Sequence, residues 1–143
     1  MNINDYLIYG FDFIEETSGS FSVIANDDLG GATCGDTYEK AYYMAQWYVR
    51  DTADDLFRDF QFIPKALPVK ANQVAVNIGV DSALKIMLLN CLVELRIKKG
   101  MLAKLMGISP AALNQYLRFD KTTKFETIAK AFDVIGKPLK ISC

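Results

Sequence analysis

A short segment around residue 114 carries polar side chains at a spacing that can read nucleic-acid bases. Ala111, Asn114, Gln115 and Arg118 recur at intervals of three and four, so a helix over residues 110–118 would present them on one face. Asn and Gln can form paired hydrogen bonds with adenine, Arg can bind guanine or a phosphate, and a small Ala leaves room for a thymine methyl group. This face predicts contact with base edges in a DNA groove.

The residues around this face have the pattern of a helix-turn-helix. Gly107 permits a sharp turn between two helices, Ser109 can cap the second helix, and Pro110 occupies its first position, where the missing N–H does no harm. Ala103 is small where the two helices cross. Apolar side chains can close the small core between the helices: Leu102, Met106, Ile108, Leu113 and Leu117. The alternative is a plain helical hairpin with a solvated polar face, but turn, cap, core spacing and basic charge all favour DNA binding.

The predicted DNA-binding set continues beyond this helix. The basic and hydroxyl residues at positions 121–124 lead into the next helix, where side chains and free backbone N–H groups can hold phosphate. The complete set is Ser109, Ala111, Asn114, Gln115, Arg118, Lys121, Thr122, Thr123 and Lys124.

Charge divides the chain into two unlike halves. Residues 1–69 hold four basic and twelve acidic side chains, a net charge of −8, and residues 70–143 hold twelve basic and five acidic ones, a net charge of +7. A basic half suits phosphate and an acidic half suits a basic protein. The predicted protein-binding residues of the acidic half lie on or beside an expected hairpin: Asp12, Glu15, Glu16, Asp27 and Asp28. Solvation of an ordinary surface is the alternative role for these carboxylates.

An aromatic cluster adds two more candidates for partner binding. Trp47 and Tyr43 lie opposite the apolar stripe of an expected long helix, with Met44 and Arg50 on the same side. Exposed patches of this kind more often mark an interface than bare surface. A partner-binding or self-association surface is therefore expected here, with packing against the linker as the alternative.

Composition excludes several classes of protein. The 143 residues are 51% hydrophobic and 23% charged, and no apolar run is long enough to cross a bilayer, so a soluble globular protein without a membrane partner is expected. The start of the chain lacks a signal-peptide pattern, which favours a cytoplasmic location. There is no histidine, and the three cysteines form no CxxC pair. We therefore expect no enzyme activity, no metal site and no cofactor.

The N-terminal half has the pattern of a small sheet followed by one long helix. Residues 6–14 and 21–26 are rich in aromatic and branched apolar side chains and are separated by turn residues, and residues 32–34 favour a short third strand. Asp36 and Glu39 fit a capping box for a helix over residues 37–60. The stripe of this helix that would cover the sheet contains Tyr38, Ala41, Tyr42, Ala45, Val49, Thr52, Leu56 and Phe60.

A linker containing Pro64 and Pro68 separates this half from a mainly helical one. Charge, aromatic content and periodicity all change near Pro68, so we predict domains over residues 1–69 and 70–143. The fold class predicted from the whole pattern is α+β.

The second predicted domain begins with a strand over residues 74–78. Asp81 or Ser82 can cap the following helix, which reaches about residue 97 and is apolar on nearly every side, so a second subunit can help to cover it. Shorter helices are expected over residues 100–106, 110–118 and 125–135. A closing strand over residues 139–141 is expected to pair with residues 74–78, in the same chain or in the other subunit of a dimer.

Several segments together resemble a known family. Residues 19–23 read Gly-Ser-Phe-Ser-Val, and residues 34–41 are similar to a "QGDTxEEA" segment that opens a long helix. Further matches are Phe62-Ile63-Pro64 and residues 82–90. Over nearly its whole length the chain resembles the HicB-type antitoxins of type II toxin–antitoxin systems, in the branch with a C-terminal helix-turn-helix. The loop over residues 27–31 departs from the proline-containing turn that is common in that family.

This resemblance implies a fold and a function. It implies a partial ribonuclease H-like ββ(β)α domain that covers the active site of a small, basic, mRNA-cleaving toxin of HicA type. It also implies a C-terminal domain that dimerises, as a homodimer or higher homo-oligomer, and represses its own operon by binding operator DNA. The alternative is a stand-alone helix-turn-helix regulator, such as a phage-derived one, whose N-terminal domain oligomerises or binds an effector.

Overall fold

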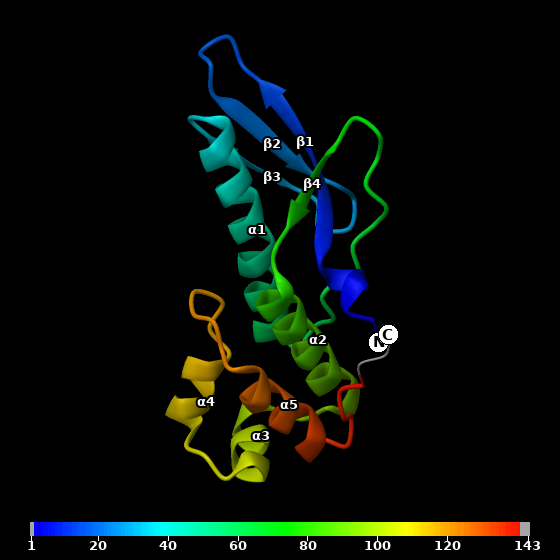
Figure 1. Ribbon diagram of the computed structural model, residues 1–143, viewed down its shortest axis with the longest axis vertical. Coiled ribbons are helices and arrows are strands. Elements are labelled where there is room, and N and C mark those ends of the chain that lie inside the picture. Colours follow the sequence, from blue (N-terminus) through cyan, green and yellow to red (C-terminus); the bar gives the residue numbers. More distant parts are fainter. Residues whose placement is uncertain (1, 141–143) are drawn as a thin grey trace.

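The computed structural model describes residues 2–140, and its sheet and its short helices lie at opposite ends of the molecule (Figure 1). Helix α2 (Val80–Leu95) lies between the two ends. The elements, in chain order, are a 3₁₀ helix η1 (Ile3–Tyr6), β1 (Ile8–Glu15), β2 (Phe21–Ala25), β3 (Ala32–Gly35), α1 (Tyr38–Arg58), β4 (Val74–Asn77), α2 (Val80–Leu95), α3 (Lys99–Met106), α4 (Pro110–Tyr116) and α5 (Phe125–Val134). The predicted α+β class is confirmed.

The sheet is antiparallel, with strand order β3-β2-β1-β4, and α1 covers one of its faces. Because successive side chains of a strand point to opposite faces, alternate residues of β1 and β2 turn toward α1, among them the buried Tyr9, Phe11 and Val23. The helix meets them with small or apolar residues, of which Ala41 and Ala45 are completely buried. Small side chains on α1 let the helix lie close to the sheet.

The start and the buried stripe of α1 differ from the prediction in detail. Thr37 is the N-cap, and its hydroxyl oxygen accepts from the backbone N–H of Lys40 at 3.1 Å, so the predicted capping box of Asp36 and Glu39 is wrong by one residue. The buried stripe is Ala41, Ala45, Val49, Ala53 and Phe57. Ala41, Ala45 and Val49 agree with the predicted stripe, whereas Phe60 lies beyond the end of the helix, with φ 54°.

The strand after the linker completes the N-terminal sheet. Val74 and Val76 pair with Phe11 and Tyr9 of β1, a pairing that the sequence analysis did not predict. β1 offers apolar cross-strand partners in the same chain, and β4 forms an edge of the described sheet. Leu139 is not in a strand, and residues 141–143 lie outside the described residues. The predicted domain boundary between residues 69 and 70 would separate β4 from β1, although the two strands belong to the same sheet.

Helix α2 is the centre of the molecule. Every residue from Ser82 to Val93 is buried, because α2 packs against η1, α1 and α5 of its own chain. The helix starts after Gly79, which has φ 87°, and the predicted side-chain cap by Asp81 or Ser82 is absent. Within residues 2–140 no helix combines the length and the hydropathy that a bilayer span requires.

Candidate functional site

Helices α3 and α4 lie over the residues for which the sequence predicts a helix-turn-helix, and α5 packs against α3. Gly107 ends α3 in the left-handed region, with φ 70°, and turns the chain toward α4. Ser109 is the N-cap of α4, and its hydroxyl oxygen accepts from the backbone N–H of Ala112 at 3.1 Å. Pro110 is the first residue of the helix. The turn and the cap therefore lie where the sequence predicted them.

A small apolar core holds the helices of this arrangement together. Leu102, Ala103, Met106, Leu113 and Leu117 are buried, as predicted, while Ile108 is half-buried. Phe119, which the sequence analysis did not select, is buried as well. The packing fixes which side of α4 remains free.

The free side of α4 carries the predicted base-reading residues. Ala111, Asn114 and Gln115 are exposed on the helix. Arg118 lies beyond the end of α4 at Tyr116, so its predicted place on the helix face is wrong. Its Nε donates to Oδ1 of Asp120 at 2.8 Å. We name Ala111, Asn114 and Gln115 the reading face, with Arg118 at its C-terminal border.

The loop between α4 and α5 brings together the other predicted DNA-binding residues. Lys121 Nζ donates to Oε1 of Gln115 at 3.0 Å, which places its ammonium group beside the reading face. Thr122 and Lys124 are exposed. Thr123 instead shapes the loop, since its hydroxyl donates to the carbonyl of Tyr116 at 2.6 Å.

A buried ion pair on α2, which the sequence analysis missed, holds this loop in place. The side chain of Lys85 has no exposed surface, and its ammonium group donates to the carbonyls of Arg118 and Lys121, each at 2.6 Å. Oδ2 of Asp81 lies 2.7 Å from the same nitrogen, and Oδ1 of Asp81 accepts from the backbone N–H of Thr123 at 2.9 Å. All three ammonium donors therefore have acceptors. A lysine within a mainly apolar helix, four residues after an aspartate, is the sequence signal that could have found this pair.

The predicted acidic residues of the N-terminal half fall into two separate groups. Asp12, Glu15 and Glu16 lie toward the β1–β2 hairpin, where Glu16 accepts from the hydroxyl of Ser22 at 2.8 Å. Asp27 and Asp28 lie past the opposite end of β2.

Asp28 has a structural role in its loop. Its carboxylate accepts from the backbone N–H groups of Leu29 at 2.7 Å and Leu67 at 2.9 Å, and so ties the loop to the linker. Gly30 and Gly31 complete the turn with φ 67° and 79°, in the place of the proline-containing turn.

The sheet face that turns away from α1 is partly apolar and exposed. Asp12 of β1 pairs with Ile24 of β2, and Ile14 lies two residues further along β1 on the same face. Ile14 and Ile24 retain 46% and 40% of their surface. We call Asp12, Ile14 and Ile24 the outer sheet patch. The sequence analysis selected the aspartate but not the two isoleucines, because their exposure depends on which sheet face the helix covers.

The aromatic cluster on α1 is less exposed than predicted. Tyr43 and Trp47 are in edge contact, with ring centroids 6.5 Å apart, but Trp47 is half-buried. The Arg50 guanidinium lies 5.0 Å from the centroid of the Trp47 ring and donates to the carbonyl of Ile78 at 2.9 Å. Part of the cluster therefore serves to join α1 to the segment between β4 and α2.

No protein-family model matches the sequence. The chain is 31% identical over 133 residues to antitoxin HicB 2 of Photorhabdus laumondii, and the matched region covers 93% of this chain and 94% of that protein. It is 29% identical to antitoxin HicB 1 of the same organism, over 87% of this chain and 79% of that protein. It is 24% identical to antitoxin HicB of Escherichia coli K12, over 86% of this chain and 89% of that protein. This similarity along nearly the whole length shows that the chain belongs to the HicB antitoxin family.

Proposed function

We propose that the chain binds and inhibits a small, basic, mRNA-cleaving toxin of HicA type and represses its own operon by binding operator DNA. The DNA-binding half of the proposal rests on one observation. The reading face is exposed on α4, while Ser109 caps this helix and the apolar side of the helix is buried. Asn114 and Gln115 have side chains that pair with adenine, and the neighbouring loop supplies phosphate ligands through Lys121 and Lys124.

The outer sheet patch supports the toxin-binding half of the proposal. It combines two exposed isoleucines with the Asp12 carboxylate, next to the acidic hairpin residues Glu15 and Glu16. The first 69 residues carry a net charge of −8, which steers a basic partner toward this end of the molecule. An apolar centre with a charged rim is the usual composition of a protein interface.

A second copy of the chain is part of the proposal. Helix-turn-helix proteins commonly bind two half-sites as symmetric dimers. A groove along α2 and α5 is lined by both apolar and charged side chains, and Val80 and Phe125 within it keep 57% and 46% of their surface exposed. Burial of these side chains against a second copy would stabilise a dimer.

The DNA-binding half is tested with the DNA upstream of this gene and a random duplex of equal length. Gln115→Ala is expected to weaken binding to the upstream DNA by about 1–3 kcal/mol and to leave binding to random DNA unchanged, because a base contact is lost. Lys124→Ala is the matched comparison, and it is expected to weaken both and to lower the salt slope by about 1. Equal loss on both duplexes for Gln115→Ala would contradict the assigned reading face.

The toxin-binding half is tested by growth. Expression of a short, basic reading frame beside this gene is expected to arrest growth, and simultaneous expression of this chain is expected to restore it. Failure of a well-expressed, folded chain to restore growth would favour the stand-alone regulator.

A further inference from the structure

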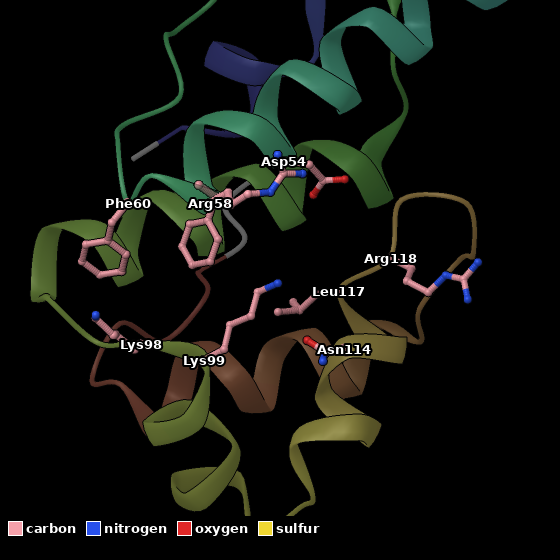
Figure 2. A pocket seen from close by; sticks show the side chains of 9 residues that line it. Asp54, Arg58, Phe60, Lys98, Lys99, Asn114, Leu117 and Arg118 are labelled. Atoms are coloured by element: carbon pink, nitrogen blue, oxygen red, sulfur yellow. The ribbon is translucent and has the colours of Figure 1, made fainter.

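A groove of about 550 Å³ lies between the end of α1 and the helix-turn-helix. Figure 2 shows Lys99 reaching from the start of α3 toward α1, while the Asn114 amide of α4 lies at the opposite wall. Arg58 and Phe60 come from the end of α1 and the residues after it. Elements far apart in the sequence therefore form one surface.

The groove is predominantly cationic. Arg58, Lys98, Lys99 and Arg118 line it together with the carboxylate of Asp54. Arg58 also lies 3.1 Å from the Asp55 carboxylate, and Arg118 pairs with Asp120, so Lys98 and Lys99 supply the uncompensated charge. Among residues 2–140 no carboxylate lies within ion-pair distance of Lys98 or Lys99. No side chain caps α3, whose N-terminal end adds a partial positive charge. The surface is therefore complementary to an anion.

The groove is continuous with the reading face. Asn114 belongs to both surfaces, and Arg118 lines the groove at the border of the reading face. In Figure 2 the Arg118 guanidinium points out of the groove, which leaves Lys99 and Asn114 as the inward-facing groups. A duplex whose bases contact Asn114 therefore has its sugar–phosphate backbone next to this groove.

We propose that the groove receives the DNA backbone beside the operator half-site, and that Arg58 of α1 is a phosphate ligand together with Lys98 and Lys99. This inference rests on the proposed operator binding and extends the DNA contact onto the helix that covers the N-terminal sheet. The cations are solvated rather than enclosed, since the Arg58 side chain is 73% exposed. Exposed cations on several elements suit a polyanion, which they bind with release of counterions, better than a small enclosed anion.

The test compares Arg58→Gln with Lys40→Gln. Both positions lie on α1 and are exposed, and both changes remove one positive charge, but Lys40 lies near the other end of the helix. Loss of one phosphate contact lowers the slope of log affinity against log salt by about 0.9, so the affinity ratio of wild type to Arg58→Gln should change by about 3.5-fold between 50 and 200 mM salt. Lys40→Gln should keep the wild-type slope. Asp54→Asn should have the opposite effect and strengthen binding, because it removes the carboxylate from the groove.

The outcomes separate this inference from the proposed function. A wild-type slope for Arg58→Gln, in a protein that binds operator, would overturn the groove proposal alone. Absence of any operator binding by the wild type would overturn the proposed function and the groove proposal together. Saturable binding of pyrophosphate at micromolar concentration, followed by NMR shifts of the Lys99 and Asn114 amides without DNA, would overturn the groove proposal in favour of a small anionic ligand.

Discussion

Replacement of Lys85 by Met removes an ammonium group that α2 buries completely and that holds the loop carrying Lys121 and Lys124. The methionine side chain keeps the apolar stem, but the Asp81 carboxylate and the carbonyls of Arg118 and Lys121 lose their partner. Loss of one member of a buried ion pair costs about 3–5 kcal/mol. The Asp81 side chain is 22% exposed, and water can reach its carboxylate. We therefore expect a loss near the lower limit, about 3 kcal/mol in the free energy of unfolding.

Urea unfolding measures this loss, with Lys137→Met as the matched control. Lys137 lies 3.8 Å from Glu94 in an exposed pair, for which a loss of about 1 kcal/mol or less is expected. In the double variant of Lys85→Met with Asp81→Asn, the loss should be smaller than the sum of the two single losses, because no uncompensated charge remains. Hydrogen exchange of the Thr123 amide should accelerate in Lys85→Met. The reasoning would be refuted if Lys85→Met were no more destabilising than Lys137→Met.

Two further predictions concern packing and thiol chemistry. A Cβ at Gly35 would collide with the backbone of α1, so Gly35→Ala should lower the free energy of unfolding by about 1–3 kcal/mol. Gly100 lies in open space on α3, and Gly100→Ala should leave the free energy of unfolding unchanged or raise it. Equal effects of the two changes in urea unfolding would contradict the close approach of Gly35 to α1. Burial raises the pKa of the Cys91 thiol, whereas Cys34 is exposed. Iodoacetamide should therefore label Cys34 long before Cys91, as followed by peptide mapping. Equal labelling rates of the two thiols in the folded protein would contradict the packing of α2.

The features predicted correctly from the sequence are those whose causes are local. Gly107, Ser109 and Pro110 specify the turn and the start of α4 within four residues, and the apolar spacing around them specifies the small core. The same locality explains why the exact cap of α1 was missed by one position. Asp36 and Thr37 are both good capping residues, and only the backbone conformation decides between them.

The features that were missed depend on contacts between distant segments. β4 joins β1 across more than sixty residues, and the alternating pattern of a strand does not name its partner. Two of the three acceptors of Lys85 are the backbone carbonyls of Arg118 and Lys121, which lie 33 and 36 residues further along the chain and which no side-chain pattern encodes. The exposure of Ile14 and Ile24 likewise follows from the position of α1 on the opposite face of the sheet.

The most direct test of the central claim is the affinity between this chain and the purified product of the short, basic reading frame beside its gene, measured by isothermal titration calorimetry. The wild type should form a stable complex, and Ile24→Asp should abolish it by placing a charge in the outer sheet patch. Leu105→Asp, at an exposed apolar position of α3, is the control and should bind as the wild type does. Circular dichroism establishes that each variant is folded. The absence of a complex with the folded wild type, or equal affinities for wild type and Ile24→Asp, would contradict the account.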